Sequence, residues 1–159
     1  MWREYLPYQN AIDISRNEQE TYCATPYGIY SVSLSDHMIE RYSRITGLNG
    51  IGISKIQFDN ATGKLVVAYD DSNIDILYRN DIINIPDITR DNITGDKSIR
   101  QIHIIGDKYY LATGLGIIVL DEQRYEVSDT WLIGDGGNKV GVNAIANDVQ
   151  YIYAATEEG

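Results

Sequence analysis

The sequence of 159 residues is poor in several residue types, and each shortage excludes a class of protein. Cys23 is the only cysteine, which excludes an intrachain disulfide and a zinc site built from several cysteines. No stretch reaches the roughly 18 consecutive apolar residues that a membrane-spanning helix requires. Lysine and arginine number 13 against 23 aspartate and glutamate residues, for a net charge of −10. Because such a surface repels phosphate backbones and no basic patch stands out, we expect no nucleic-acid partner.

The length and the first residues set further limits. A chain of 159 residues is long enough for one ordinary hydrophobic core, so we predict one domain, or part of one, over residues 1–159. The start of the chain carries charges at Arg3 and Glu4 and has no apolar run. We therefore expect no secretory signal peptide within this chain.

No motif in the sequence predicts catalysis or cofactor binding. Asp71, Asn73 and Asp75 match the first three ligand positions of a calcium loop, but isoleucines replace the glycine and the glutamate that such a loop needs. The two histidines, His37 and His103, lie far apart in the sequence and are not expected to share a metal. We predict a protein that is not an enzyme and that has no catalytic residues, no metal site and no cofactor.

A repeat is what the sequence does contain. The phrase "YCATPYGI" at Tyr22 has a near copy, "YLATGLGI", at Tyr110, and a shorter one, "YAATEEG", at Tyr153. Its alanine recurs every 43 or 44 residues, and an isoleucine about a dozen residues earlier keeps nearly the same step. The two series are Ala24, Ala68, Ala112 and Ala155, and Ile12, Ile56, Ile102 and Ile145. A period of 40 to 50 residues is typical of helical arrays and of propeller blades.

The pattern inside each repeat favours strands over helices. Apolar residues alternate with a step of two, and turn-forming residues interrupt the pattern every 8 to 12 residues, which leaves no room for an ordinary helix. We predict four short antiparallel strands per repeat. In the third repeat they cover residues 101–105, 109–113, 117–121 and 125–131.

These observations predict an all-β fold, a partial β-propeller of about three and a half four-stranded antiparallel blades with a period near 44 residues. The repeats cover about residues 11–52, 53–98 and 99–141, with a half repeat at 142–159. A sandwich or a barrel is the rival architecture, but neither requires a sequence repeat. Since a propeller closes with four or more blades, this chain would leave blade faces uncovered, and we expect it to self-associate through them.

The repeated phrase predicts the turn between the second and third strands of a blade. Pro26 would preset the first corner of a type I turn, and Gly28 would supply a positive φ. In the second repeat the turn is one residue longer, and Asn73 would take the place of the glycine.

The longest connections follow the fourth strand of each repeat, at 43–52, 86–98 and 134–141. In a propeller these loops emerge on one rim with the second-to-third turns, so this rim is the predicted binding face, although the loops could also merely span a wider radius. The candidate contact residues are Asn49, Arg90, Asn92, Asp96, Lys97, Asp135, Asn138 and Lys139.

Several longer phrases resemble one family. "WREYLPYQNA", "ERYSRITGLN", "NIPDI", "GDKSI" and "YLATGLGIIVLDEQRYEVSDTWLIG" are similar to the first blades of PorZ-like components of the Bacteroidetes type IX secretion system, over Trp2 to Gly159. The resemblance implies an exported protein of the cell surface or outer membrane, a non-catalytic scaffold that helps to sort and anchor secreted proteins. Its implied partners are an attachment complex with a sortase and anionic lipopolysaccharide.

The alternative function is the periplasmic ligand-sensing propeller of a hybrid two-component regulator, which uses similar blade phrases. The typical Trp-Ile-Gly-Thr phrase of those sensors is replaced here by "LVVAYDD" and "YLATGLG". A propeller hydrolase or lyase would need an acid, a base or a metal cluster, none of which the sequence nominates.

Overall fold

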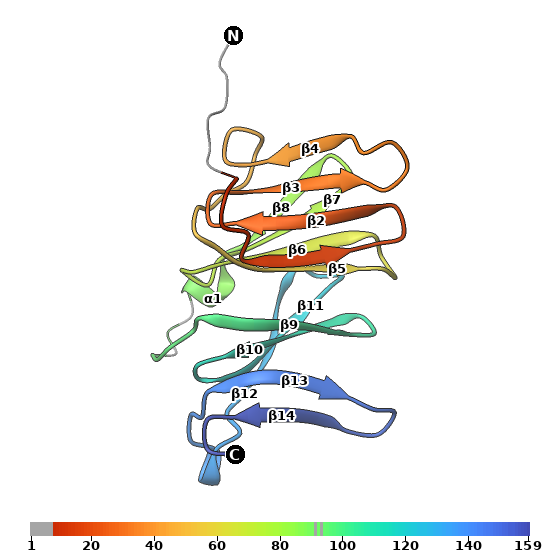
Figure 1. Ribbon diagram of the computed structural model, residues 1–159. Coiled ribbons are helices and arrows are strands. Elements are labelled where there is room, and N and C mark those ends of the chain that lie inside the picture. Colours follow the sequence, from red (N-terminus) through yellow and green to blue (C-terminus); the bar gives the residue numbers. More distant parts are fainter. Residues whose placement is uncertain (1–7, 91, 93) are drawn as a thin grey trace. The chain divides into compact units, whose positions relative to one another are not determined.

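The computed structural model describes residues 8–90, 92 and 94–159 and consists of antiparallel sheets (Figure 1). Trp2 to Pro7, which contribute to the family resemblance, lie outside the described residues. The chain divides into two compact units. The first comprises the residues up to Asp70 together with Ile74–Asn84, and the second comprises Asp71–Asn73 and Ile85–Gly159.

The first unit contains two four-stranded blades, each with its strands paired in chain order. Blade 1 consists of β1 (Asp13–Arg16), β2 (Glu20–Thr25), β3 (Gly28–Ser33) and β4 (Ile39–Tyr42). Blade 2 consists of β5 (Ile53–Asp59), β6 (Lys64–Tyr69), β7 (Ile74–Tyr78) and β8 (Asp81–Ile85).

Alternation along these strands builds the core between blades 1 and 2. Tyr22 and Ala24 of β2 share a buried cluster with Leu65, Val67 and Tyr69, the alternate residues of β6 that lie on one face of blade 2. The buried cluster consists of Tyr22, Ala24, Ile29, Leu48, Ile53, Ile56, Phe58, Leu65, Val67, Tyr69 and Leu77. Because burying one large apolar side chain contributes about 1.5–3 kcal/mol, this shared cluster is what holds the two sheets together.

The second unit repeats this arrangement with one and a half blades. Blade 3 consists of β9 (Ile99–Ile105), β10 (Lys108–Thr113), β11 (Gly116–Asp121) and β12 (Glu126–Trp131), and the half blade of β13 (Val142–Asn147) and β14 (Ile152–Thr156). Ala112, Ile117 and Val119 of blade 3 share a core with Val142 and Ile145 of β13. The predicted strands of the third repeat are therefore confirmed to within two residues.

Helices in the described residues are confined to two loops. The one-turn helix α1 (Asp87–Arg90) and the 3-10 turn η1 (Asp135–Gly137) lie within the connections that follow the fourth strands of blades 2 and 3. In the part of the chain that is described, no helix has the length and apolar character needed to cross a membrane.

Hydrogen bonds between neighbouring first strands repeat at the predicted period. In the first unit, Asp13 Oδ2 accepts a bond from the Ile56 amide at 2.9 Å. In the second unit, Gln101 accepts one from the Ile145 amide, and His103 Nε2 lies 2.8 Å from Asn147 Oδ1. The acceptors Asp13 and Gln101 hold equivalent positions in their blades, so the sequence repeat is also a repeat of blade-to-blade contacts.

The structure corrects the predicted role of Gly28 in the turn. Gly28 does not have a positive φ. A Cβ at Gly28 would lie 2.8 Å from the Tyr42 carbonyl oxygen, and one at Gly116 would lie 2.2 Å from that of Trp131. The glycine is needed because the end of the fourth strand approaches it closely; only at Gly116, where φ is 146°, is the backbone also unusual.

The turn of blade 2 also differs from the prediction. Ser72, with φ of 68°, takes the left-handed conformation, and Asn73 does not. The Asn73 amide instead donates to Asp71 Oδ1 at 2.9 Å. Asp71 therefore stabilises the extra residue of this turn through its side chain, as aspartate does in many turns.

The threonine of the repeated phrase closes the turn. Its hydroxyl donates to the carbonyl oxygen of the residue three positions later, at 2.9 Å from Thr25 to Gly28, 2.9 Å from Thr113 to Gly116 and 2.8 Å from Thr156 to Gly159. The same oxygen lies within reach of the amide two residues on, at 3.4 Å for Tyr27. Threonine recurs because one side chain satisfies backbone groups that the reversal leaves unpaired.

Candidate functional site

Two kinds of surface are candidates for function: the long loops that the sequence predicts, and cavities at the short hairpin turns of the first unit. The loops lie in both units, and each unit is described by itself.

Asn49, the predicted contact residue of the first unit, binds a buried carboxylate. Its backbone amide and its Nδ2 donate to the Asp75 carboxylate at 2.8 and 3.0 Å. Tyr69 and Asn84 donate to the same carboxylate at 2.6 and 2.8 Å. Because Asp75 is fully buried, these bonds replace its hydration, and Asn49 anchors the 43–52 loop to β7.

In the second unit the structure brings the 86–98 and 134–141 loops together. Lys139 Nζ donates to the Thr94 carbonyl oxygen, and Lys97 Nζ donates to that of Ile88 at 2.9 Å. The Ser72 hydroxyl donates in turn to the Lys97 carbonyl oxygen at 2.7 Å. Two of the predicted contact residues, Lys97 and Lys139, therefore use their ammonium groups to fix loop backbone.

Asp96 belongs to a cluster around Arg100, which the sequence analysis did not single out. The Arg100 guanidinium donates to Glu157 at 2.7 Å, to Asn143 at 2.9 Å and to Asp96 at 3.2 Å. The hydrogen bond to Glu157 is the main cause that raises the pKa of Arg100, and the Ser98 hydroxyl is the main cause that lowers the pKa of Asp96. The cluster links the start of β9 with β13 through Asn143 and with the turn after β14 through Glu157.

The other predicted contact residues face solvent. Arg90, Asn92, Asp135 and Asn138 are all exposed. Asn138 Nδ2 donates to the Asp135 carbonyl oxygen at 2.7 Å and closes the 134–141 loop. This loop and the end of α1 therefore present polar side chains on a locally fixed backbone. Among the described residues, no group of three potential metal ligands comes together.

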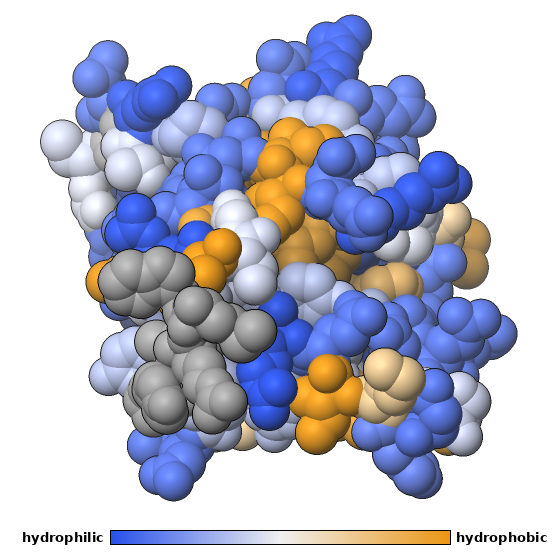
Figure 2. All heavy atoms as spheres, turned by 90° about the horizontal axis from the view of Figure 1, so that it is seen from above, coloured by the Kyte–Doolittle hydropathy of each residue, from blue (hydrophilic) through white to orange (hydrophobic). Residues whose placement is uncertain are grey.

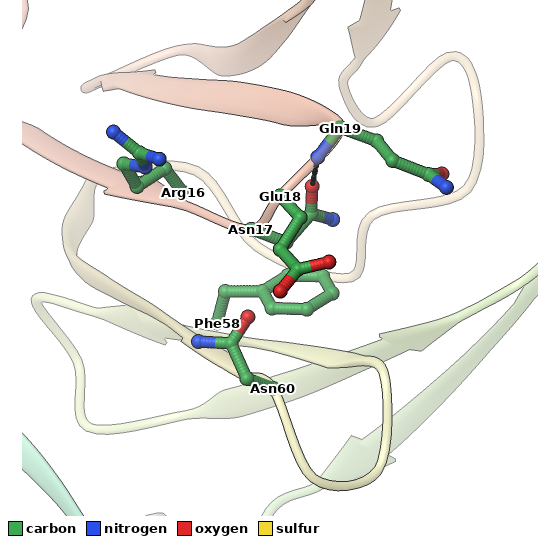
Figure 3. A pocket seen from close by; sticks show the side chains of 6 residues that line it. All are labelled: Arg16, Asn17, Glu18, Gln19, Phe58 and Asn60. Atoms are coloured by element: carbon green, nitrogen blue, oxygen red, sulfur yellow. Dashed lines mark hydrogen bonds between the residues drawn. The ribbon is translucent and has the colours of Figure 1, made fainter.

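The larger cavities of the first unit lie at its hairpin turns, where the sequence predicts no binding site. One of about 550 Å³ is lined by Arg16, Asn17, Glu18, Gln19, Phe58 and Asn60 (Figure 3). Asn17 Oδ1 accepts a hydrogen bond from the Gln19 backbone amide at 2.7 Å, and this bond stabilises the turn. The only available signal was the polar "NEQE" stretch, which any solvent-exposed turn could contain.

A smaller cavity of about 310 Å³ lies between blades 1 and 2 on the same side. Its walls carry the carboxylates of Glu20 and Glu40, and its lining residues include Tyr22, Tyr42 and Phe58. The Tyr22 hydroxyl donates to Glu20 at 2.5 Å, and the Tyr42 hydroxyl donates to Glu40 at 2.8 Å. Burial is the first cause of the raised pKa of both tyrosines, and the hydrogen bond to the glutamate is the second. The pKa of Tyr42 rises to about 12, so the hydroxyl stays a protonated donor at neutral pH.

Comparisons with known proteins agree with this architecture. Residues 13–159 match the family model described as "TSS9, PorZ, N-terminal beta-propeller domain". The solved structure of PorZ from Porphyromonas gingivalis, described as an essential bacterial surface component of the type IX secretion system, matches with a TM-score of 0.81 and 24% identity. The match covers 92% of this chain and 19% of that one, so the chain spans about a fifth of the length of that PorZ.

Other solved structures share the fold at lower identity. The computationally designed protein Ika4 matches with a TM-score of 0.69 and 11% identity, covering 100% of this chain and 95% of that one. Apo AztD from Citrobacter koseri matches with a TM-score of 0.65 and 12% identity, and the match covers 91% of this chain and 40% of that one. None of the curated proteins matches the chain. The predicted partial β-propeller and the predicted family resemblance are both confirmed.

Proposed function

Because the chain belongs to the family of N-terminal β-propeller domains of PorZ, a component of the type IX secretion system, we propose that it is a non-catalytic scaffold of that machinery. In this proposal it acts at the cell surface or outer membrane, within an attachment complex that includes a sortase and that sorts and anchors secreted proteins. The family match over residues 13–159 is the observation that carries the proposal.

The exposed loops of the second unit are the proposed contact surface for a protein partner. Their backbone is held by Lys97, Lys139 and the Arg100 cluster, so exposed side chains such as Asp135 and Asn138 are presented with little further loss of entropy. Loops fixed on a sheet scaffold are where propellers and other β folds usually bind.

Anionic lipopolysaccharide is the proposed second ligand, with Arg90 as its contact. Among the basic candidates in the described residues, Arg90 is exposed and its guanidinium has no hydrogen bond or ion pair, whereas Lys97 and Lys139 bind carbonyl oxygens. A net charge of −10 opposes binding of an anion elsewhere on the surface.

Self-association through an uncovered blade face is proposed for the isolated chain. Large apolar side chains are exposed in blade 1, with Ile14 at 62% and Ile39 at 51% exposure. Seen from above, apolar atoms form a band between hydrophilic ones (Figure 2). Sedimentation at increasing concentration tests this proposal. Concentration-dependent dimers that disappear in Ile14→Ser support it, and a monomer at all concentrations contradicts it.

An affinity-capture experiment tests the proposed function. The tagged 159-residue chain is added to detergent-extracted outer membranes of a bacterium with type IX secretion, and captured proteins are identified. We expect capture of the sortase-containing complex, and a loss of at least severalfold for Asp135→Ala with Asn138→Ala. Gln123→Ala, in the β11–β12 turn, is the matched control and should not change capture. Equal capture by both variants would place the contact elsewhere, and no specific capture would contradict the proposal.

A further inference from the structure

Two carboxylates, those of Glu20 and Glu40, and one guanidinium, that of Arg79, line the cavity between blades 1 and 2. Glu20 accepts hydrogen bonds from the Tyr22 hydroxyl at 2.5 Å and from the Ser31 hydroxyl at 3.4 Å, and Glu40 accepts one from the Tyr42 hydroxyl at 2.8 Å. Within the described part of the chain, neither carboxylate forms an ion pair. Because two carboxylate oxygens can accept about four hydrogen bonds, both groups keep acceptor capacity toward a ligand.

Blade 3 has an ion pair at the position that corresponds to Glu20 in blade 1. In blade 1, Glu20 of β2 lies opposite Ser33 of β3. At the equivalent register of blade 3, Lys108 of β10 lies opposite Asp121 of β11, and the two form an ion pair. The repeat therefore places an ammonium group in blade 3 where blade 1 has an unneutralised carboxylate.

The surroundings of this position are alike in the two blades. The next inward residue of the second strand is a tyrosine in both, Tyr22 and Tyr110. On the fourth strand an acidic residue accepts a bond from the aromatic side chain two positions later, from Tyr42 to Glu40 at 2.8 Å and from the Trp131 indole to Asp129 at 2.7 Å. Blade 3 has a lysine among these groups, and blade 1 has none.

The lining of the cavity suits an organic cation. The rings of Tyr22 and Phe58 stack across the two blades with centroids 5.5 Å apart, and Leu65 and Leu77 complete an apolar lining. Aromatic rings attract an ammonium group, and an apolar lining accommodates the methylene chain that carries it. Arg79 also lines the cavity, and its guanidinium lies 5.0 Å from the centroid of the neighbouring Tyr78 ring.

We propose that this cavity binds an alkylammonium group, the lysine side chain of a partner protein, between Glu20 and Glu40. The partner would supply the cation that Lys108 supplies within blade 3. The inference uses the geometry of the first unit and the internal repeat, so it stands or falls independently of the proposed role in type IX secretion.

Titration of the isotope-labelled 159-residue chain with Nα-acetyl-lysine methylamide tests the proposal by NMR. We expect saturable shifts of the amide signals of Glu20, Tyr22 and Tyr42 in the millimolar range. The Nε-acetylated form of the same probe is neutral and should cause none. Equal shifts with both probes, or no shifts with either, would overturn the proposal. Cadaverine separates a free amine from a protein side chain: tighter binding of the lysine derivative supports a protein partner, and tighter binding of cadaverine overturns that assignment.

Matched variants locate the binding. Glu20→Gln and Glu40→Gln should each weaken binding at least threefold, and Glu158→Gln, the same change of charge in the second unit, should leave it unaltered.

The double variant Glu20→Lys with Ser33→Asp brings the ion pair of blade 3 into blade 1. It should fold, since blade 3 tolerates the pair, and it should lose binding because its own lysine occupies the cavity. Binding by this folded variant with unchanged affinity would refute the inference.

Discussion

Blades 1 and 3 have the same strand order and the same turn between their second and third strands, but they carry different charged side chains. Thr25 and Thr113 close the same turn with the same hydrogen bond, and the following glycines meet the same carbonyl group of the fourth strand. Yet Glu20 in blade 1 corresponds to Lys108 in blade 3. The repeat therefore keeps the residues that the turn and the core require, while the outer ends of the strands vary and can carry function.

The largest expected effect tests the shared backbone contact. In Gly116→Ala the new Cβ would meet the Trp131 carbonyl oxygen at 2.2 Å, and the φ of 146° is strained for alanine. We expect a loss of about 3 kcal/mol or more in the free energy of unfolding, measured by urea denaturation. In Gly28→Ala the new Cβ would lie 2.8 Å from the Tyr42 carbonyl oxygen, and φ is not positive. This variant should lose about 1–2 kcal/mol in the free energy of unfolding. Equal costs would show that the two turns differ less than their geometry indicates.

The next effect tests a feature that blade 2 has and blade 3 lacks. Asp75 is fully buried under hydrogen bonds from Asn49, Tyr69 and Asn84, whereas the equivalent residue of blade 3 is the apolar Ile118. Asp75→Ala removes the acceptor of four hydrogen bonds, two from Asn49 and one each from Tyr69 and Asn84, and should cost about 3 kcal/mol in the free energy of unfolding. Hydrogen exchange should also accelerate in the 43–52 loop. An unchanged loop would mean that Asn49 does not depend on Asp75 for its position.

A smaller effect follows from exchanging the charges between blades. The Glu20→Lys with Ser33→Asp variant should change the free energy of unfolding by less than about 1 kcal/mol, because a partly exposed ion pair contributes little. Thermal denaturation measures this. A much larger loss would indicate that blade 1 cannot accept the side chains of blade 3, and the equivalence of the two blades would not hold.

The smallest effect concerns pH and the ion pair of blade 3. The pKa of Asp121 is lowered from 3.8 to about 2, first by the hydrogen bond from the Lys108 ammonium and next by the one from the Arg124 amide. Because the folded-state pKa is the lower one, the stabilisation is present above pH 3.8 and is lost as the pH falls toward 2. In Lys108→Ala the carboxyl should titrate closer to its ordinary value in NMR spectra. An unchanged titration would mean that the neighbouring amides of Gln123 and Arg124, which also donate to Asp121, hold the pKa down by themselves.

The sequence alone predicted the sheets because their signals are local. Strand alternation and turn residues act within one blade, the 44-residue step relates each blade to the next, and the strands of blade 3 were predicted to within two residues. The role of Gly28 was predicted wrongly because its constraint, the Tyr42 carbonyl group, lies on another strand. A turn residue can be recognised from its neighbours in sequence, but a close approach of backbone cannot.

The candidate site was less predictable for the same reason. Loop length drew attention to Asn49, Lys97 and Lys139, but only the fold shows that their polar groups bind Asp75, Ile88 and Thr94. The Arg100 cluster joins residues as far apart as Asp96 and Glu157, and no spacing rule connects them.

The repeat and the strand pattern follow from residue types at fixed steps along the chain, and the family resemblance follows from contiguous phrases, so the order of the residues is enough to predict all three. Only the folded chain shows which charges form ion pairs and where a cavity remains between the sheets. Those depend on which side chains meet across two sheets, as Tyr22 and Phe58 do between blades 1 and 2. Electrostatic and packing energies act through space, so the chain order of the groups that share them does not reveal them.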